Sequence, residues 1–368
     1  MVSGANRCVA CSAALSALLV FGCKPNLEGR PSLIDTGRVL AVQSVPAEQV
    51  PDDAPITQYL ALYASPIEND KHASELGWAF CNIRKPLAVI GPSALECLAP
   101  SGKGLRQIGQ GEMVSAPLDK DACSVFGPTP AMASSRPADP DTTGGYYQPI
   151  RVLVPTDGAP DYVVGVTRLS CGVANVTQDQ AIDFATRYRP NENPVLSAIT
   201  LRHANGHEET LTSDDPSADI STPTLKPGER ITFHASWASC PTKQTCGDGI
   251  CGPGEFADDR TVGGVHIAGC PDDCTMPKGC TGAEPYVALD PVSLGIVDRR
   301  EAMLVAWFAT DGTFDNDATG RTEQEAHDAF SENEWVAPVA KGTVHFWFVL
   351  RDDRGGVGWT ELSLDVGS

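Results

Sequence analysis

Residues 344–366 read VHFWFVLRDDRGGVGWTELSLDV. At every second position the first seven residues place Val344, Phe346, Phe348 and Leu350 on one apolar face. The last five alternate between apolar and polar side chains, with Leu362, Leu364 and Val366 on the apolar side. Because successive side chains of a strand point to opposite faces, this period of two predicts two half-buried strands. The turn residues Asp353–Gly356 lie between them, so we expect an antiparallel pair.

Outward from this pair, similar phrases occur twice in the chain. RVLAVQS at 38–44 resembles PVLSAIT at 194–200, and each precedes an alternating strand, TQYLALYAS at 57–65 and RITFHAS at 230–236. Each half then has a strand with a central tryptophan, at 76–81 and 303–308, and we expect Trp78 and Trp307 in the cores. The repetition predicts a mostly β protein of two immunoglobulin-like antiparallel β-sandwiches.

Turn signals divide the halves further. Hairpins are expected at Asp157–Gly158 and Asn205–Gly206. The segment 177–188 fits either a helix or a strand that closes the first sandwich, and we expect the strand. Residues 124–145 are rich in Pro and Ser and predict a surface loop. The predicted domains are therefore a leader at 1–22, a tether at 23–37, a first sandwich at 38–189 and a second at 190–368.

Composition excludes several classes of function. The 368 residues carry a formal charge of −20, which disfavours nucleic acid and anionic membrane surfaces as partners, since both require basic patches. The motifs of zincins, serine hydrolases, P-loop proteins and dinucleotide-binding proteins are all missing. A Ser-His-Asp set assembled in space would leave no such signature.

The N-terminus predicts export. Residues 8–21 (CVACSAALSALLVF) have the length of the apolar region of a secretory signal. They end in Val20-Phe21-Gly22-Cys23, which resembles the bacterial lipobox. This resemblance implies cleavage before Cys23, acylation of that residue and delivery to the outer membrane, facing the periplasm or the cell surface. A plain signal peptide or an anchor helix is the alternative.

The cysteine count agrees with an oxidising compartment. Of thirteen cysteines, three lie in the leader or at the lipidation position. The even number that remains predicts five disulfides among Cys81, Cys97, Cys123, Cys171, Cys240, Cys246, Cys251, Cys270, Cys274 and Cys280. We expect pairs 81–171, because the strands concerned are neighbours in an immunoglobulin sheet, and then 97–123. A swapped pairing among these four cysteines is the alternative. Cys240 is expected to pair with Cys280.

A cysteine-rich insert is predicted at 246–274. CGDGICGPGE at 246–255 and CPDDC at 270–274 resemble a small module of exported bacterial proteins, in which cross-links replace a core. Calcium is the one cofactor considered, because it prefers oxygen ligands. Its candidate ligands are Asp248, Glu255, Asp272 and Asp273, together with Asp315 and Asp317 of a second acidic loop; turn chemistry and solvation are the favoured interpretation of all six.

The whole pattern is similar to predicted secreted lipoproteins of myxobacteria with immunoglobulin- or PKD-like domains. The resembling phrases cover most of the mature chain: RVLAVQSVP (38–46), GGYYQP (144–149), RYRPNENP (187–194), AWFATDGTF (306–314) and VLRDDRGGVGW (349–359). The resemblance implies an exported, mostly β protein and carries no activity.

Two candidate contact surfaces follow from the pattern. If the apolar faces of the last two strands form the core, His345, Trp347 and Trp359 lie outside on one sheet. Packing of these residues under a loop or against the first domain is the alternative, and it is the favoured interpretation. Tyr146 and Tyr147, on a glycine-preceded loop, suit either a contact surface or cover for a sandwich edge.

The sequence thus predicts a lipid-anchored, disulfide-bonded envelope protein with a non-enzymatic role in binding, adhesion or structure. Its partners would be the membrane, through the lipid, and a protein or glycan. A calcium-dependent binding module and a hydrolase with an active site assembled in space are the alternatives.

Overall fold

A computed structural model describes residues 30–51, 56–86, 93–128, 143–156, 158–174, 176–240, 246, 257–262, 265–271, 280–290, 293 and 295–367. The chain divides into two units, Met1–Arg30 and Pro31–Ser368, and every helix and strand below belongs to the second. None of the helices formed by these described residues has the length and apolar character needed to cross a membrane.

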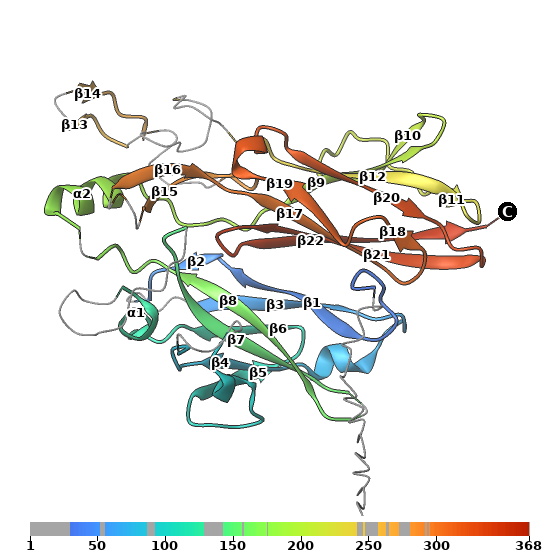
Figure 1. The fold of residues 1–368 in the computed structure, drawn as a ribbon, viewed down its shortest axis with the longest axis horizontal. Coiled ribbons are helices and arrows are strands. Elements are labelled where there is room, and N and C mark those ends of the chain that lie inside the picture. Colours follow the sequence, from blue (N-terminus) through green and yellow to red (C-terminus); the bar gives the residue numbers. More distant parts are fainter. Residues whose placement is uncertain are drawn as a thin grey trace, which may run out of the picture. The chain divides into compact units, whose positions relative to one another are not determined.

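The first sandwich consists of two antiparallel sheets (Figure 1). One sheet has the order β1-β3-β6, with β1 Arg38–Val45, β3 Ile56–Ala64 and β6 Met113–Pro117. The other has the order β2-β8-β7-β4-β5, with β2 Glu48–Gln49, β8 Asp161–Leu169, β7 Tyr146–Val154, β4 Gly77–Cys81 and β5 Leu105–Gln110. The two-residue strand β2 joins the edge of the second sheet in parallel to β8.

The second sandwich follows the same plan. One sheet has the order β10-β9-β12-β20-β18, with β10 Glu208–Ser213, β9 Leu196–His203, β12 Arg230–Trp237, β20 Phe330–Val336 and β18 Thr313–Phe314. The other has the order β11-β22-β21-β17-β19, with β11 Thr224–Leu225, β22 Val357–Val366, β21 Gly342–Asp352, β17 Met303–Ala309 and β19 Ala318–Arg321. The predicted fold class, two antiparallel immunoglobulin-like sandwiches, is confirmed.

The two sandwiches correspond strand by strand. The order β1-β3-β6 recurs as β9-β12-β20, and β2-β8-β7-β4-β5 recurs as β11-β22-β21-β17-β19. Even the short parallel strand is repeated, since β11 pairs with β22 as β2 does with β8. The repeated phrases of the sequence therefore mark equivalent strands.

Each core is built around the predicted tryptophan. Trp78 in β4 and Trp307 in β17 occupy equivalent strands, and both are 0% exposed. Their indole nitrogens donate to the Gly111 carbonyl at 2.7 Å and to Thr319 Oγ1 at 2.9 Å. Each ring therefore fills a core and also satisfies its polar atom, which makes complete burial favourable.

Among the described residues, two short hairpins and several short helices lie outside the main sheets of the sandwiches. The hairpins are β15 Pro285–Leu289 with β16 Ile296–Arg300, and β13 Arg260–Val262 with β14 Val265–Ile267. The helices are α1 Ala122–Phe126 and α2 Gln178–Arg187, and short 3-10 turns span Lys71–Glu75, Leu95–Leu98 and Glu323–Glu325. Helix α1 takes up the first residues of the predicted Pro- and Ser-rich loop, of which 129–142 lie outside the described residues.

The strand expected at 177–188 is wrong, because this segment is helix α2. Thr177 is its N-cap: Thr177 Oγ1 accepts from the Gln180 amide, and Gln180 Oε1 accepts from the Thr177 amide at 2.9 Å. This reciprocal capping box satisfies two amides that the first helical turn leaves free. The Thr-x-x-Gln spacing was the signal that should have favoured a helix.

Replacing Thr177 with alanine is expected to lower the free energy of unfolding by about 1 kcal/mol, because the cap bond to the Gln180 amide is lost. Thr177→Ser, which keeps the hydroxyl, is the matched control and should lose much less. Urea midpoints of the two variants check this. Equal losses would show that the cap does not stabilise α2.

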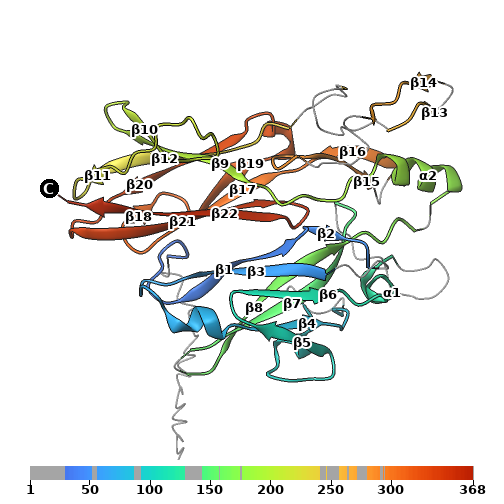
Figure 2. The same cartoon turned by 180° about the vertical axis from the view of Figure 1, so that it is seen from behind.

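The two sandwiches meet face to face. The outer faces of β1 and β3 lie against those of β17, β21 and β22, as Figures 1 and 2 show from opposite sides. The apolar interface between them, the interdomain apolar cluster, comprises Ile34, Leu40, Ala41, Leu62, Ala64, Ala306, Trp347, Val349 and Val357. Hydrogen bonds cross it as well, from Arg351 Nη2 to the Leu40 carbonyl at 2.6 Å and from Gln43 Nε2 to the Val357 carbonyl.

Candidate functional site

The two predicted contact tryptophans lie in this interface. Trp347 is 6% exposed, and its indole nitrogen donates to Glu361 Oε2 at 3.1 Å. Trp359 is half-buried against the same cluster. They do not form an exposed stripe, because their face of the sheet covers the first sandwich; the alternative interpretation, packing against the first domain, describes them correctly. His345 is half-buried and its Nδ1 lies 2.7 Å from Ser363 Oγ.

The two tyrosines at the start of β7 are also engaged internally. Tyr146 packs against the core of the first sandwich. The hydroxyl of Tyr147 accepts from Arg168 Nη1 at 2.6 Å, and the Arg168 guanidinium lies 5.5 Å from the Tyr147 ring centroid. Cover for the sandwich edge therefore describes this pair better than a contact surface.

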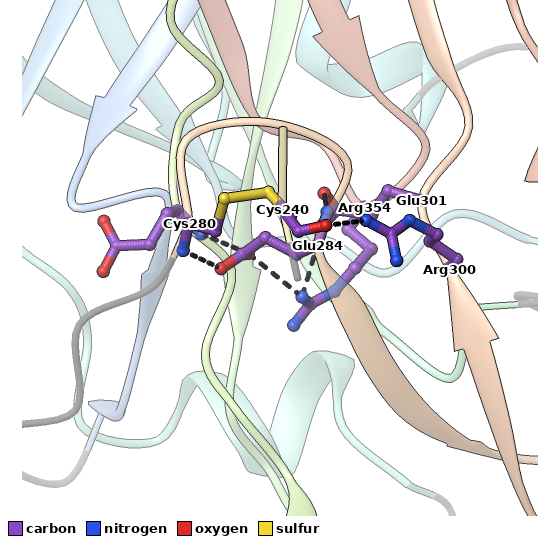
Figure 3. The surroundings of a disulfide bond; sticks show 7 residues. Cys240, Cys280, Glu284, Arg300, Glu301 and Arg354 are labelled. Carbon is purple, nitrogen blue, oxygen red and sulfur yellow. Dashed lines mark hydrogen bonds and ion pairs between the residues drawn. A yellow bond between two sulfur atoms is a disulfide. The ribbon is translucent and has the colours of Figure 1, made fainter. Parts of the chain in front are cut away.

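Four disulfides link described cysteines: Cys81–Cys97, Cys123–Cys171, Cys240–Cys280 and Cys246–Cys270. The expected pair Cys240–Cys280 is present (Figure 3). The expected pairs 81–171 and 97–123 are wrong, because β7 lies between β4, which ends at Cys81, and β8, which Cys171 follows. Cys81 is linked instead to Cys97 in the 3-10 turn Leu95–Leu98, and Cys171 is linked to Cys123 in helix α1. Cys23, Cys251 and Cys274 lie outside the described residues.

Of the acidic candidates for calcium, some lie outside the described residues and others lie within them. Asp248, Glu255, Asp272 and Asp273 lie outside the described residues. Asp315 lies 3.5 Å from Arg230, and Asp317 Oδ1 accepts from the Ser32 amide at 3.2 Å. Within the described ranges, no group of three or more His, Cys, Asp and Glu side chains is placed to hold a metal ion.

Sequence reasoning missed a large buried polar feature. A group of buried charged and amide side chains, here called the interdomain charge network, lies where the first sandwich, the connecting segment and the second sandwich meet. Its members are Glu48, Arg168, Asn191, Glu284, Glu301, Asp352 and Arg354, and each is at most 9% exposed.

Glu48, in β2, anchors the network in the first sandwich. Its Oε2 accepts from Arg168 Nε at 3.2 Å, from the Asn191 amide at 2.9 Å and from Arg354 Nη2 at 3.4 Å. Its Oε1 accepts from Ser170 Oγ at 2.8 Å and from the Tyr188 hydroxyl. A carboxylate with this many donors is well stabilised in a buried site.

Arg354, in the turn between β21 and β22, connects Glu48 to the second sandwich. Its Nη1 lies 3.3 Å from Glu301 Oε1 and 3.5 Å from Glu284 Oε2, as Figure 3 shows in part. Its Nη2 also donates to the carbonyl of Arg189, in the connecting segment, at 2.7 Å. Aromatic rings of Tyr286 and Tyr188 lie 4.9 and 5.8 Å from the guanidinium. One side chain therefore contacts all three parts of the chain.

The three buried carboxyls of the second sandwich all have raised pKa values. Burial raises the pKa of Glu284 to about 8, although Arg354 opposes the shift. Burial, with Asp352 and Glu284 nearby, raises the pKa of Glu301 well above its ordinary value. Burial also raises the pKa of Asp352, against the hydrogen bonds of the Gly356 amide and Arg354. The network is therefore an acid-rich site with fewer cations than carboxyls.

The polar connecting segment 189–193 was the available signal. The boundary predicted between the two sandwiches, after residue 189, lies in this segment, and Pro190 offers no backbone donor with which to continue a strand. In the structure Asn191 is 2% exposed, and its Nδ2 donates to Asp352. Asn193 Nδ2 similarly donates to the Ser44 carbonyl at 2.7 Å. A polar segment between two sandwiches can therefore lie buried between them as well as form an exposed linker.

The hydrolase alternative requires a histidine that can act as a general base. His203 has carboxylates at both ring nitrogens, Glu229 at 2.8 Å and Glu209 at 2.9 Å. Burial acts against its charge, but these two partners raise its pKa overall. An imidazolium that donates to two carboxylates has no lone pair with which to accept a proton from a serine.

No protein-family profile and no curated protein matches this sequence. Among solved structures, the D00-D0 domain of intimin is similar at 8% identity, covering 89% of this chain and 100% of that chain, with a TM-score of 0.19. The C-terminal domain of the Streptococcus agalactiae AgI/II polypeptide BspA is similar at 10% identity, 90% and 99% coverage and a TM-score of 0.19. The Bacteroides ovatus mixed-linkage glucan utilization locus protein SGBP-B, in complex with a mixed-linkage heptasaccharide, is similar at 12% identity, 90% and 70% coverage and a TM-score of 0.17. At such TM-scores these likenesses carry no argument about function.

Proposed function

We propose that this chain is a lipid-anchored envelope protein with a non-enzymatic role, in which two sandwiches act as one rigid body in adhesion, envelope structure or the binding of a protein or glycan. The observation that carries the proposal is the interdomain charge network, which with the apolar cluster ties the two sandwiches together. Domains that need to move independently have small, wet interfaces, whereas this one is buried and cross-bonded.

The disulfides support a location outside the cytosol. Cytosolic thiols are kept reduced, so a chain with several structural disulfides is typical of an exported protein. Attachment through Cys23 remains the proposal that the lipobox-like sequence supports. Acyl chains at one residue would suffice for firm attachment, because each buried CH₂ contributes about 0.8 kcal/mol.

The intact mass of the protein purified from cell envelopes tests this proposal. We expect a chain that begins at Cys23, is heavier than its sequence by several acyl groups, and gains the mass of two hydrogens per disulfide on reduction. Cys23→Ser is the matched control and should be neither acylated nor retained in the membrane fraction. A retained leader, or an unmodified Cys23 in the wild type, would contradict the anchor.

The binding role has a separate test. Beads that carry the mature chain should adhere to surfaces coated with envelope glycan or protein, and beads that carry the reduced, unfolded chain should not. Adhesion that is equal for the two forms would reject a role for the folded sandwiches.

A further inference from the structure

We propose that the interdomain charge network holds two protons, on Glu284 and Glu301, and that their loss weakens the attachment of the second sandwich to the first. The contact between the sandwiches would then respond to the pH outside the cytosol. This inference goes beyond the proposed function, since it requires neither the anchor nor a binding partner.

The charge balance of the network carries the first step. Its ionisable members are two guanidinium groups, Arg168 and Arg354, and four carboxyls, Glu48, Glu284, Glu301 and Asp352. With all six ionised, the buried site would have an excess of two negative charges. Because an uncompensated buried carboxylate is more costly than a neutral one, buried acids take up protons instead.

The hydrogen bonds indicate which carboxyls are ionised. Glu48 has two arginines among its donors. Asp352 Oδ1 accepts from the amides of Arg354 and Gly356 at 2.8 and 2.7 Å, and Asn191 Nδ2 donates to the same carboxylate. Glu48 therefore has both arginines as ion-pair partners, and three hydrogen bonds to Asp352 favour its ionised form although burial raises its pKa.

Glu284 and Glu301 are the carboxyls that remain. Both share one nitrogen, Arg354 Nη1, at the long distances of 3.5 and 3.3 Å. Otherwise Glu301 accepts from the Glu284 amide at 2.9 Å, and Glu284 accepts from the amides of Cys280 and Glu192 at 2.8 and 3.2 Å. The backbone amides favour the ionised form of each carboxyl, but Glu301 accepts one such bond and both side chains share a single cationic nitrogen, so burial outweighs these contacts.

The neighbouring arginines have other hydrogen-bond or ion-pair partners, although Arg300 also attracts Glu301 through its charge. Arg300 of β16 turns its guanidinium to the Cys240 carbonyl at 2.5 Å (Figure 3), and Arg299 pairs with Glu323 at 2.9 Å. The remaining groups that face the two carboxyls are acids or phenols, namely Glu192 and Tyr188 of the connecting segment, Tyr286 of β15 and the exposed Asp353.

Proton loss would act on the contact through Arg354. While Glu284 and Glu301 are neutral, the charge of Arg354 is available to Glu48, whose carboxylate binds Arg354 Nη2 and so joins the first sandwich to the second. Once ionised, Glu284 and Glu301 compete for the same guanidinium, and their repulsion from Glu48 and Asp352 is relieved only by water entering the site. Both effects weaken the contact that joins the sandwiches.

The sign of the pH dependence follows from linkage. A carboxyl whose pKa is raised on folding holds its proton in the folded chain and releases it on unfolding. Its contribution to the stability of the folded chain is therefore fully present below the ordinary pKa of the carboxyl, and it is lost as the pH rises toward the raised pKa. Each such proton lowers the folding equilibrium constant about tenfold per pH unit between pH 5.5 and 7.5.

The test compares the mature wild-type chain with Glu284→Gln/Glu301→Gln, whose amides resemble protonated carboxyls in shape and cannot ionise. Glu208→Gln, a 61% exposed position of β10, is the matched control. Urea unfolding from pH 5.5 to 7.5 measures how steeply the folding equilibrium constant falls with pH. For the wild type and the control, the fall per pH unit should be larger than for the double variant, by a factor of up to about a hundred. His203 titrates in all three chains, so its contribution cancels. Parallel pH profiles would overturn the proposal.

If the double variant fails to fold, infrared spectroscopy of the wild type tests whether buried carboxyls are protonated at neutral pH. At pH 7 the exposed carboxyls are ionised, so a protonated-carboxyl C=O band reports only groups with raised pKa values. We expect such a band at pH 7 and its loss at alkaline pH, together with a larger radius of gyration in X-ray scattering. A spectrum without the band at pH 7 would reject the protonated pair, and a band lost at unchanged radius would reject its link to the contact.

Discussion

Replacing Arg354 with methionine should lower the free energy of unfolding by about 3–5 kcal/mol, the cost of removing one partner from a buried ion pair. Arg354 is 0% exposed and bonds Glu48 of the first sandwich, the Arg189 carbonyl of the connecting segment, and Glu284 and Glu301 of the second sandwich. Methionine would keep much of the volume and would leave Glu48, Glu284 and Glu301 without this cation. Urea unfolding followed by tryptophan fluorescence and circular dichroism measures the loss.

Arg230→Met provides the control for this prediction. Arg230 pairs with Glu334 at 2.6 Å and with Asp315 at 3.5 Å, but it is 56% exposed. An exposed pair contributes about 0–1 kcal/mol, so this variant should stay close to the wild type. We also expect the Arg354 variant to unfold in two steps, because the sandwiches then melt separately. Similar losses in the two variants would show that the interdomain charge network does not stabilise the molecule.

The second large effect is expected from the disulfide Cys123–Cys171. Its sequence separation is 48, and closing a loop of this length limits the unfolded chain enough to contribute about 4 kcal/mol. Cys123→Ser/Cys171→Ser should lose about this much stability, measured by urea unfolding against the wild type. A loss below about 1 kcal/mol would contradict the structural role of this link.

The single variant Cys123→Ser tests the pairing itself. The structure predicts that it exposes a free thiol at Cys171, located by alkylation and peptide mapping. The pairing expected from the sequence would instead free Cys97. Cys240→Ser is a control, since its partner Cys280 is the same in both interpretations.

The sequence was informative where local pattern decides structure. The alternation at 344–350 appears as β21, the Asn205–Gly206 turn joins β9 to β10, and Trp78 and Trp307 fill their cores. Each of these features depends on neighbours a few residues apart, where period and turn chemistry act directly.

Features that depend on distant parts of the chain could not be predicted. The outward face of β21 has the same alternation whether water or another sandwich covers it, so the pattern alone did not say what buries Trp347. Likewise Glu48 and Arg354 are separated by 306 positions, and each alone resembles an ordinary surface charge. Their burial follows from how the two sandwiches meet, which no local pattern records. The helix at 178–187 differs, because its capping box was visible and was given too little weight.

The central claim, that both sandwiches form one rigid body, is tested most directly by residual dipolar couplings of the mature chain at pH 6 in a dilute aligned medium. We predict that a single alignment tensor fits the backbone amides of β1, β3, β4, β7 and β8 together with those of β9, β12, β17, β21 and β22. Two tensors of clearly different magnitude, one for each sandwich, would contradict the account.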